Sequence, residues 1–390
     1  MKEKDILPDF LDIALPLLRL PTAPYHEHHI VAAIDRVVAG WAASDAPLTS
    51  QRDAAGNMWI RYDGRGQGPW LHLTGHLDHP GFGYVEHLTA RDLLFERLGG
   101  VPAQFCRNAP VQIHASDGSH RALAGTIISY IEEGLFDGEP RPAFRVRLDE
   151  GTEGSQLIGP GSFAMWDLPW ASTKKQRLRA PACDDVAGVA VALAVLSQVI
   201  KQKLDTRLGL LLTRAEETGF GGMLDLVTAD GLDREAVYIN IECSSCLSGA
   251  PLGEGPVIRV GDRRWLFDPV ITAALVAAAG GSASREAIPV QRRLMDGGTC
   301  EATVLSRAGV PTAAVALPLG NYHNTGKHGV RPEVIDLNDA AHLIRLLLRL
   351  AESRTADLLD PTLDPLGKEL SRRHQAQSPR LRQSAPGLPS

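Results

Sequence analysis

The sequence has few cysteines and no pattern that would pair them. Its 390 residues contain five Cys, an odd number, and only Cys243 and Cys246 lie close together. Proteins that depend on disulfide bonds carry dense cysteines in even numbers, so the count excludes a disulfide framework and favours a reducing compartment. We therefore expect a cytoplasmic protein. No second cysteine pair exists to complete a zinc knuckle, and we interpret Cys243 and Cys246 as small buried apolar side chains.

The sequence also lacks a basic excess, a long apolar run and a phosphate-binding loop. A net charge of -6 and a pI near 6.1 give no electrostatic footprint for nucleic acid. The most apolar stretch, VAGVAVALAVLSQVI, is too short for a membrane span and follows two aspartates, which predicts a buried helix. No GxxxxGK motif supports nucleotide chemistry. Acids and prolines interrupt the N-terminal apolar residues, which indicates an amphipathic helix and not a signal peptide.

Strand and helix patterns alternate along most of the chain. This alternation predicts an α/β fold whose mostly parallel sheet has helices on both faces. Residues 81–172 differ, because short alternating segments with turn residues between them predict a small all-β domain. We expect an α/β domain in two pieces, residues 1–80 and 173–363, interrupted by this insert. The tail over residues 364–390 is rich in Ser, Pro, Arg and Gln, and we expect it to be disordered.

Acidic and imidazole side chains follow the predicted strands. In an open parallel sheet, ligands bind at the carboxyl ends of the strands. The residues expected at that edge are His76, Asp78, Asp184, Asp185, Glu216, Glu217, Glu242 and His323. Each alone has an ordinary explanation, such as a helix cap for Asp184 or a solvated strand end for Glu242. Because all of them belong to one edge of one sheet, we interpret them as a single site.

These side chains suit a pair of divalent cations. Imidazoles and carboxylates bind zinc, cobalt and manganese, and one carboxylate can bridge two ions. Two ions roughly 3.5–4 Å apart hold a water between them and lower its pKa. The neighbouring Glu216 and Glu217 then have separate uses, since one carboxylate can bind a metal ion while the other takes the proton of that water.

The order of several short motifs resembles the tetrahedral (TET-type) dinuclear metallo-aminopeptidases, which include glutamyl and deblocking aminopeptidases. The motifs are GHLDHPGF, ACDDVAGV, TRAEETGFGG, IE followed by GEGPVIRVGDR, DGGTCEA and NYH. The resemblance extends roughly from Ile6 to Ala351. It implies a zinc-peptidase type of α/β domain, a β insert used for dimerisation or substrate contacts, and a homo-oligomer between a dimer and a dodecamer.

The resemblance also assigns roles to the residues of the site. The implied ligands of two divalent ions are His76, Asp184, Glu217, Glu242 and His323. Asp184 would bridge the ions, Asp78 would orient the imidazole of His76, and Glu216 would be the general base. Zn²⁺ is the first candidate, with Co²⁺ and Mn²⁺ as alternatives. The predicted function is removal of N-terminal residues from short peptides.

Four positions depart from the family pattern. Glu242 stands where an aspartate is usual, Val186 replaces an arginine after the acidic pair, Cys300 replaces the aspartate of GGTD, and Asn324 replaces the serine of HSP. We expect these positions to line the substrate side of the site. Two alternatives stay open: a carboxypeptidase-type amidohydrolase or deacylase with the same metal site, and a non-catalytic scaffold. The all-β insert favours the aminopeptidase, because the deacylase insert is typically an α/β lid.

Overall fold

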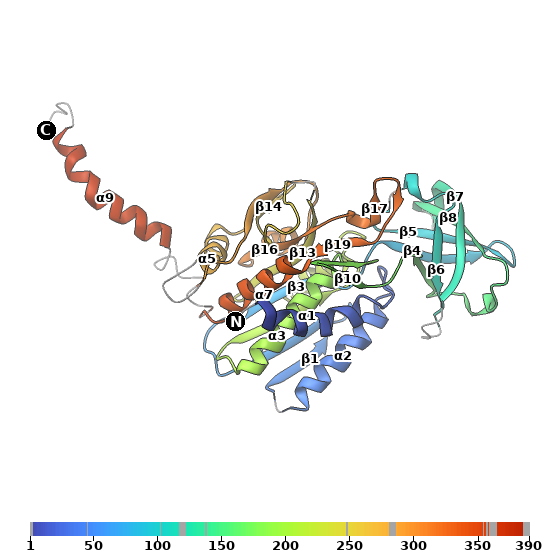
Figure 1. The fold of residues 1–390 in the computed structure, drawn as a ribbon, viewed down its shortest axis with the longest axis horizontal. Coiled ribbons are helices and arrows are strands. Elements are labelled where there is room, and N and C mark those ends of the chain that lie inside the picture. The colour runs from blue at the N-terminus through green and yellow to red at the C-terminus, as the bar shows by residue number, and fades with distance from the viewer. Residues whose placement is uncertain are drawn as a thin grey trace.

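The computed structural model divides into an α/β body, a closed β-barrel and a projecting C-terminal helix (Figure 1). The residues that it describes are 3–44, 46–101, 103–116, 122–136, 139–246, 249–280, 286–353, 355, 358 and 365–384.

An eight-stranded mixed sheet forms the centre of the α/β body. Its strands are β1 (Leu48–Arg52), β2 (Met58–Asp63), β3 (Leu71–His76), β12 (Arg207–Thr213), β13 (Val237–Ser245), β14 (Val257–Asp262), β15 (Gln291–Met295) and β16 (Thr312–Leu319). They lie in the order β1-β2-β12-β3-β13-β16-β14-β15. The four central strands, β12, β3, β13 and β16, are parallel to one another. All residues of β3 and β16 are buried, as strands covered on both faces require. The predicted α/β fold is confirmed.

Helices cover both faces of this sheet. On one face lie α1 (Glu3–Leu17), α2 (His28–Ala42), α3 (Val186–Gln202), α5 (Pro269–Ala279) and α7 (Leu337–Ala351). On the other face lie α4 (Gly221–Thr228) and α6 (Glu301–Arg307). Helix α3 is buried over its first fourteen residues because nearly all of their side chains are apolar or glycine, as the sequence predicts. Among the described residues, no helix combines the length and apolarity needed to cross a membrane.

The segment after β3 folds into a closed β-barrel. Its strands are β4 (Gly81–His87), β5 (Asp92–Leu98), β6 (Pro110–His114), β7 (Ala122–Phe136), β8 (Glu139–Leu148) and β9 (Phe163–Trp166). Buried aromatic rings fill it, with Phe82 packed edge-on against both Phe144 and Trp166. Its described residues outside the strands include only two short 3₁₀ turns, η1 (Ala103–Phe105) and η2 (Ser155–Leu157), and no α-helix. Figure 1 shows the barrel beside the α/β body, away from the projecting helix.

A small antiparallel sheet combines two strands that precede helix α3 with one strand from near the end of the α/β body. It contains β10 (Ser172–Lys174), β11 (Arg177–Ala180) and a late strand, β19 (Glu333–Asp336), with Ala180 opposite Glu333. A short hairpin of β17 (Thr325–Gly326) and β18 (Gly329–Val330) precedes β19. This arrangement brings the segment before α3 next to the segment that follows β16.

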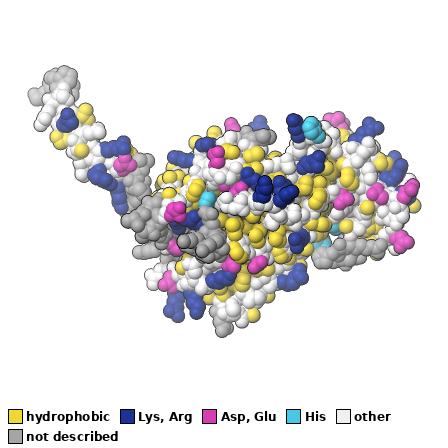
Figure 2. All heavy atoms as spheres, in the orientation of Figure 1, with side chains coloured by type: hydrophobic (Ala, Val, Ile, Leu, Met, Phe, Trp, Pro, Cys, Tyr) yellow, Lys and Arg dark blue, Asp and Glu magenta, His cyan; other side chains and the backbone are white. Residues whose placement is uncertain are grey.

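The prediction of a disordered tail is wrong for residues 365–383. These residues form helix α9 (Pro365–Gln383), which projects from the body and carries basic side chains along its length (Figures 1 and 2). Glu369 pairs with Arg373 one turn later. The polar composition of the tail shows that it cannot build a core, but Arg, Gln, Lys and Leu are good helix formers, so the same composition allows a solvated helix. The rest of the tail, apart from residue 384, lies outside the described residues.

Candidate metal centre

The central parallel strands bring the predicted site residues to one edge of the sheet. His76 is the last residue of β3, the Glu216–Glu217 pair follows β12, and Glu242 lies near the end of β13. His323 lies in the 3₁₀ turn η4 (Tyr322–Asn324) that follows β16. The strand ends meet because these strands are hydrogen-bonded neighbours in parallel register.

Asp184 lies between the two imidazoles. Its Oδ1 is 3.5 Å from Nε2 of His76, and its Oδ2 is 3.6 Å from Nε2 of His323. Oε1 of Glu217 is 3.1 Å from the same nitrogen of His323. One carboxylate thus faces a different histidine with each oxygen, which is the arrangement of a ligand shared between two cations.

Glu216 and Glu242 form a second group with His76. Oε2 of Glu216 is 4.0 Å from Nε2 of His76. One ligand atom each from His76, Glu216 and Glu242 lies within 4.8 Å of the others, and the same holds for His76, Asp184 and Glu217. His76 therefore belongs to two overlapping groups of ligand atoms.

Main-chain carbonyls orient both imidazoles. Nδ1 of His76 lies 3.1 Å from the carbonyl oxygen of Asp78, and Nδ1 of His323 lies 3.1 Å from that of Gly100. A ring nitrogen facing a carbonyl donates its proton, so Nε2 of each ring is left as a lone-pair donor toward Asp184. Gly100 follows barrel strand β5, so the connection within the barrel segment helps to complete the site.

Asp78 fixes the turn that carries the acidic pair. Its carboxylate is fully buried, and its two oxygens accept the main-chain N–H groups of Glu216 and Glu217, each at 3.0 Å. Its Oδ1 also lies 3.6 Å from Nδ1 of His76. The same carboxylate therefore contacts an imidazole on β3 and the turn after β12.

The histidines are held in a strongly anionic environment. Burial alone lowers the pKa of His76, but the charge of Glu216 and the contacts with Asp184 and Asp78 raise it well above its usual value. In the same way burial lowers the pKa of His323, and Glu217 and Asp184 raise it. Both Nε2 atoms thus face carboxylates, which favour a cation beside them.

The carboxylates repel one another where no cation separates them. Burial raises the pKa of Glu216 well above its usual value, and Glu242 and Glu217 add to this effect. Burial, reinforced by Asp184, also raises the pKa of Glu242 to about 8. For Asp184, burial opposes ionisation, yet His323 and His76 hold its pKa below its usual range. A buried cluster of this kind favours cations.

Polar atoms without a hydrogen-bond partner indicate whether divalent ions would fit the cluster. Several buried atoms that face its centre have no hydrogen-bond partner within the described parts of the chain. They are Asp184 Oδ1, Glu217 Oε1, Glu242 Oε1 and His323 Nε2. Buried polar atoms are normally paired, so these vacant lone pairs indicate a missing partner. Carboxylate oxygens and imidazole nitrogens are ligands of zinc and similar divalent ions, and the residues present fit them.

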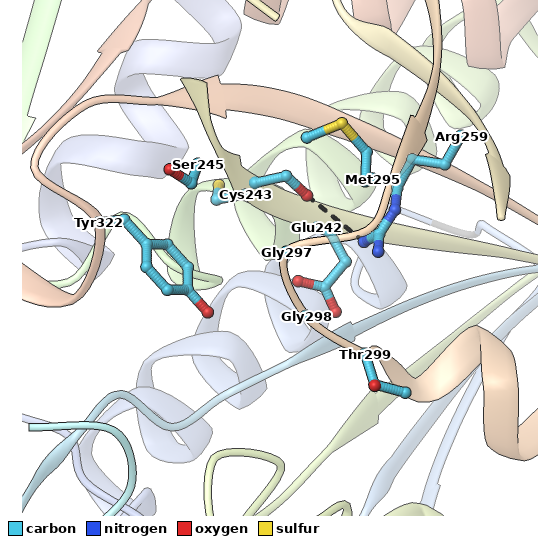
Figure 3. A pocket seen from close by; sticks show the side chains of 10 residues that line it. Glu242, Cys243, Ser245, Arg259, Met295, Gly297, Gly298, Thr299 and Tyr322 are labelled. Atoms are coloured by element: carbon cyan, nitrogen blue, oxygen red, sulfur yellow. Dashed lines mark hydrogen bonds between the residues drawn. The ribbon is translucent and has the colours of Figure 1, made fainter. Parts of the chain in front are cut away.

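A cavity of about 320 Å³ adjoins Glu242. Its lining residues are Glu242, Cys243, Ser244, Ser245, Arg259, Met295, Gly297, Gly298, Thr299 and Tyr322. Figure 3 shows Glu242, Arg259 and Tyr322 around the same space. Arg259 is only 4% exposed; its Nη1 donates to Ser244, while Nε has no hydrogen-bond partner among the residues described. Although burial lowers the pKa of Arg259, nearby Cys300, Glu242 and Asp262 raise it, so the guanidinium is charged.

Three of the departures from the family pattern do not line this cavity, which corrects the expectation from sequence. Val186 begins α3 and packs in the main hydrophobic core. Cys300 is buried and packs against Phe267. Asn324 is buried and donates to the carbonyl of Pro181. These three residues are close to site residues in sequence, but their side chains are buried in the protein interior. Of the four departures, only Glu242 lines the cavity.

Sequence reasoning missed a buried support of the acidic turn. Glu27 is fully buried, accepts the N–H of Ala215 at 3.0 Å and pairs with Nε of Arg214 at 2.8 Å. Arg214 also donates to the carbonyl of Ala55. These contacts hold the chain just before Glu216. A glutamate among the histidines of YHEHHI carries no signal for this role, because its partner lies far away in sequence.

The chain matches a family model described as M42 glutamyl aminopeptidase over residues 56–346. Among solved structures, it is similar to the aminopeptidase APDkam598 from the archaeon Desulfurococcus kamchatkensis, with 22% identity, a TM-score of 0.74, and 91% of this chain and 97% of that chain covered. It is also similar to a TET aminopeptidase from a marine sediment Thaumarchaeota archaeon, with 18% identity, a TM-score of 0.72, and coverage of 90% and 98%. The Pyrococcus horikoshii TET1 peptidase matches with 20% identity, a TM-score of 0.68, and coverage of 88% and 99%. These structural likenesses show a shared fold.

An α/β sheet with an inserted barrel and a cluster of histidines and carboxylates at its strand ends defines a peptide hydrolase of the metallopeptidase type. The chain belongs to the M42 glutamyl aminopeptidase family. The resemblance drawn from the motifs is thereby confirmed.

Proposed function

We propose that this aminopeptidase hydrolyses short peptides with two divalent metal ions, of which Zn²⁺ is the first candidate. The observation that carries the proposal is the position of Asp184, whose two oxygens face the two histidines at 3.5 and 3.6 Å. In this assignment Asp184 is shared. His76 and Glu242 would hold one ion, and Glu217 and His323 would hold the other.

When bound, ions of this kind would lower the pKa of an attacking water and polarise the scissile carbonyl of the substrate. Glu216 is assigned as the general base. Its carboxylate borders the cluster at 4.0 Å from Nε2 of His76, and Asp78 fixes its main chain. A carboxylate oxygen of Glu216 takes a proton from the attacking water and delivers it to the leaving amine.

The preferred N-terminal residue is proposed to be acidic. The cavity beside Glu242 is the space that a substrate side chain would enter, and Arg259 is its buried cation. A planar guanidinium can form paired hydrogen bonds with the carboxylate of Glu or Asp. Nε of Arg259 has no hydrogen-bond partner among the described residues, so it can donate to such a carboxylate. The glutamyl aminopeptidase description of the family agrees with this preference.

Homo-oligomeric assembly is part of the same proposal. The relative from Pyrococcus horikoshii can assemble into a tetrahedron or a large octahedral shell. We propose that residues 81–172 form a separate domain that joins subunits, whereas residues 1–80 and 173–363 form the catalytic domain. The barrel strand β7 exposes Tyr130 and Ile131, which suit such a contact. Light scattering of the purified protein gives the subunit number, and a monomer would contradict the assembly.

The activity is tested with a pool of short peptides, some of them N-acetylated, followed by mass spectrometry over time. The protein is supplied with Zn²⁺ or Co²⁺, and a chelated sample is the control. Stepwise loss of residues from free N-termini, fastest for Glu and Asp, is expected. Loss from C-termini, or loss of acyl groups alone, would assign the protein to the deacylase alternative, and no loss under either metal would support the non-catalytic scaffold.

A further inference from the structure

The carboxylate of Glu333 contacts two of the proposed metal ligands through their main chains. Oε2 of Glu333 accepts the N–H of Asp184 at 2.9 Å, and Oε1 accepts the N–H of His323 at 2.8 Å. Glu333 is fully buried at the start of β19 and lies opposite Ala180 on β11. One side chain therefore joins two ligand-bearing segments that are distant in sequence.

The main chain of His323 needs such a restraint. His323 has φ 50° and ψ 42°, and its neighbours Asn321 and Asn324 also have positive φ. A residue other than glycine is strained in the left-handed region, and this conformation persists only where surrounding contacts fix it. The hydrogen bond from the His323 N–H to Glu333 is such a contact, and the Gly100 carbonyl holds the ring of the same residue.

Asp184 is held on both sides of its main chain. Its N–H is bound by Glu333, and its carbonyl oxygen is 2.7 Å from Nδ1 of His79. Nε2 of His79 is 3.0 Å from Oδ1 of Asn324. The amide nitrogen of Asn324 donates to the carbonyl of Pro181, and its oxygen faces Nε2 of His79. The network closes a ring from Asp184 to the turn of His323.

We propose that Glu333 is a positioning residue that sets the separation of Asp184 and His323, and that His79 and Asn324 support it. The inference rests on the proposed metal centre, since it concerns the spacing of two of its ligands. Both oxygens of Glu333 accept main-chain N–H groups. A carboxylate is required, because the amide of glutamine offers one acceptor oxygen and would turn an NH₂ group against the second N–H.

A matched control separates positioning from simple structural support. Asp339 is also fully buried, and its two oxygens accept the N–H groups of Gly253 and Gly255 at 2.7 and 2.8 Å. The substitutions Glu333→Gln and Asp339→Asn therefore remove the same kind of double acceptor. Only the first involves residues proposed to bind metal. Both variants should lose stability, since each leaves a buried N–H unpaired.

The test measures zinc affinity by competition with a chromophoric chelator, the visible spectrum of the Co²⁺-loaded protein, and thermal unfolding without metal. Changing an outer partner of a metal ligand typically costs about 10–100-fold in affinity. We expect Glu333→Gln to weaken binding of at least one ion by that factor and to change the Co²⁺ spectrum. We expect Asp339→Asn to bind within about two-fold of the wild type with an unchanged spectrum.

Equal zinc affinity and equal Co²⁺ spectra in the two variants would overturn the inference. If Glu333→Gln does not fold, Glu333→Asp takes its place: it keeps both oxygens on an arm one methylene shorter, and it should show the same weakening in a milder form. Wild-type-like binding by Glu333→Asp would then overturn the inference. Failure of the wild type itself to bind Zn²⁺ or Co²⁺ would contradict the proposed metal centre, a result distinct from both.

Discussion

Replacement of Arg259 should change the specificity of the enzyme more than its overall activity. In Arg259→Met, the buried guanidinium that lines the 320 Å³ cavity is lost, while an unbranched side chain still fills part of its space. Removing one partner of a buried, hydrogen-bonded charge pair costs about 2–5 kcal/mol. Since 1.36 kcal/mol is tenfold in rate, kcat/KM for an N-terminal Glu substrate should fall between about 30-fold and about 5,000-fold.

The assay compares p-nitroanilides of Glu, Gln and Leu with the metal-loaded enzyme. Leu and Gln substrates carry no charge for Arg259 to bind, so their kcat/KM should change by less than about threefold. Arg259→Lys keeps the charge but loses the planar fork, and it should give an intermediate loss for Glu. Arg293→Met is the matched control, because Arg293 lies opposite Arg259 on the neighbouring strand β15 but is exposed.

Two results would count against a role of Arg259 in substrate selection. A wild-type enzyme that prefers Leu over Glu would show that Arg259 does not select the substrate. An equal fall for all three substrates in Arg259→Met would assign Arg259 to balancing the charges of Glu242 and Asp262, which lie close enough to raise its pKa. Zinc affinity measured on the same variant distinguishes a disturbed metal site from a changed cavity.

Two further predictions concern the metal site and the core. Asp184→Asn should weaken binding of both ions, because the shared carboxylate faces both histidines; isothermal titration with Zn²⁺ checks this, and loss of one ion alone would contradict it. Burial lowers the pKa of His72 to about 3 from its usual 6.5, so the unfolded state binds more protons between these values and stability falls as pH falls through this range. The effect is about 2 kcal/mol between pH 7.5 and pH 5. In chelator-treated protein, His72→Phe should remove this contribution to the pH dependence of the free energy of unfolding, measured with urea. An unchanged pH dependence in the variant would contradict the prediction.

The class of fold and the convergence of the site could be predicted because both follow from local patterns. Buried parallel strands read as continuous apolar runs, and the carboxyl ends of neighbouring strands must meet. This is why His76, Glu217 and His323 were expected at one edge. The antiparallel position of β14 in the sheet was not predicted, because strand order depends on long-range pairing that VIRVGD does not encode.

The supporting contacts could not be predicted for the same reason. Glu27 and Glu333 accept hydrogen bonds from main-chain N–H groups of residues that are distant in sequence. The residues next to Glu27 and Glu333 in the sequence do not indicate these contacts. A position next to a site motif also does not determine where a side chain points. Cys300 and Asn324 are adjacent to such motifs, yet neither lines the cavity. Helix α9 illustrates a different limit, since low apolar content argues against a core but not against a helix.

Glu216 is proposed to move protons at a centre that other residues build. The substitution Glu216→Gln tests this role, with bound zinc counted by elemental analysis and turnover measured on an N-terminal Glu peptide. We expect two zinc ions per subunit in both wild type and variant, and a turnover about 10²–10⁴-fold lower in the variant. Turnover close to that of the wild type, or fewer than two ions in the wild type, would contradict it.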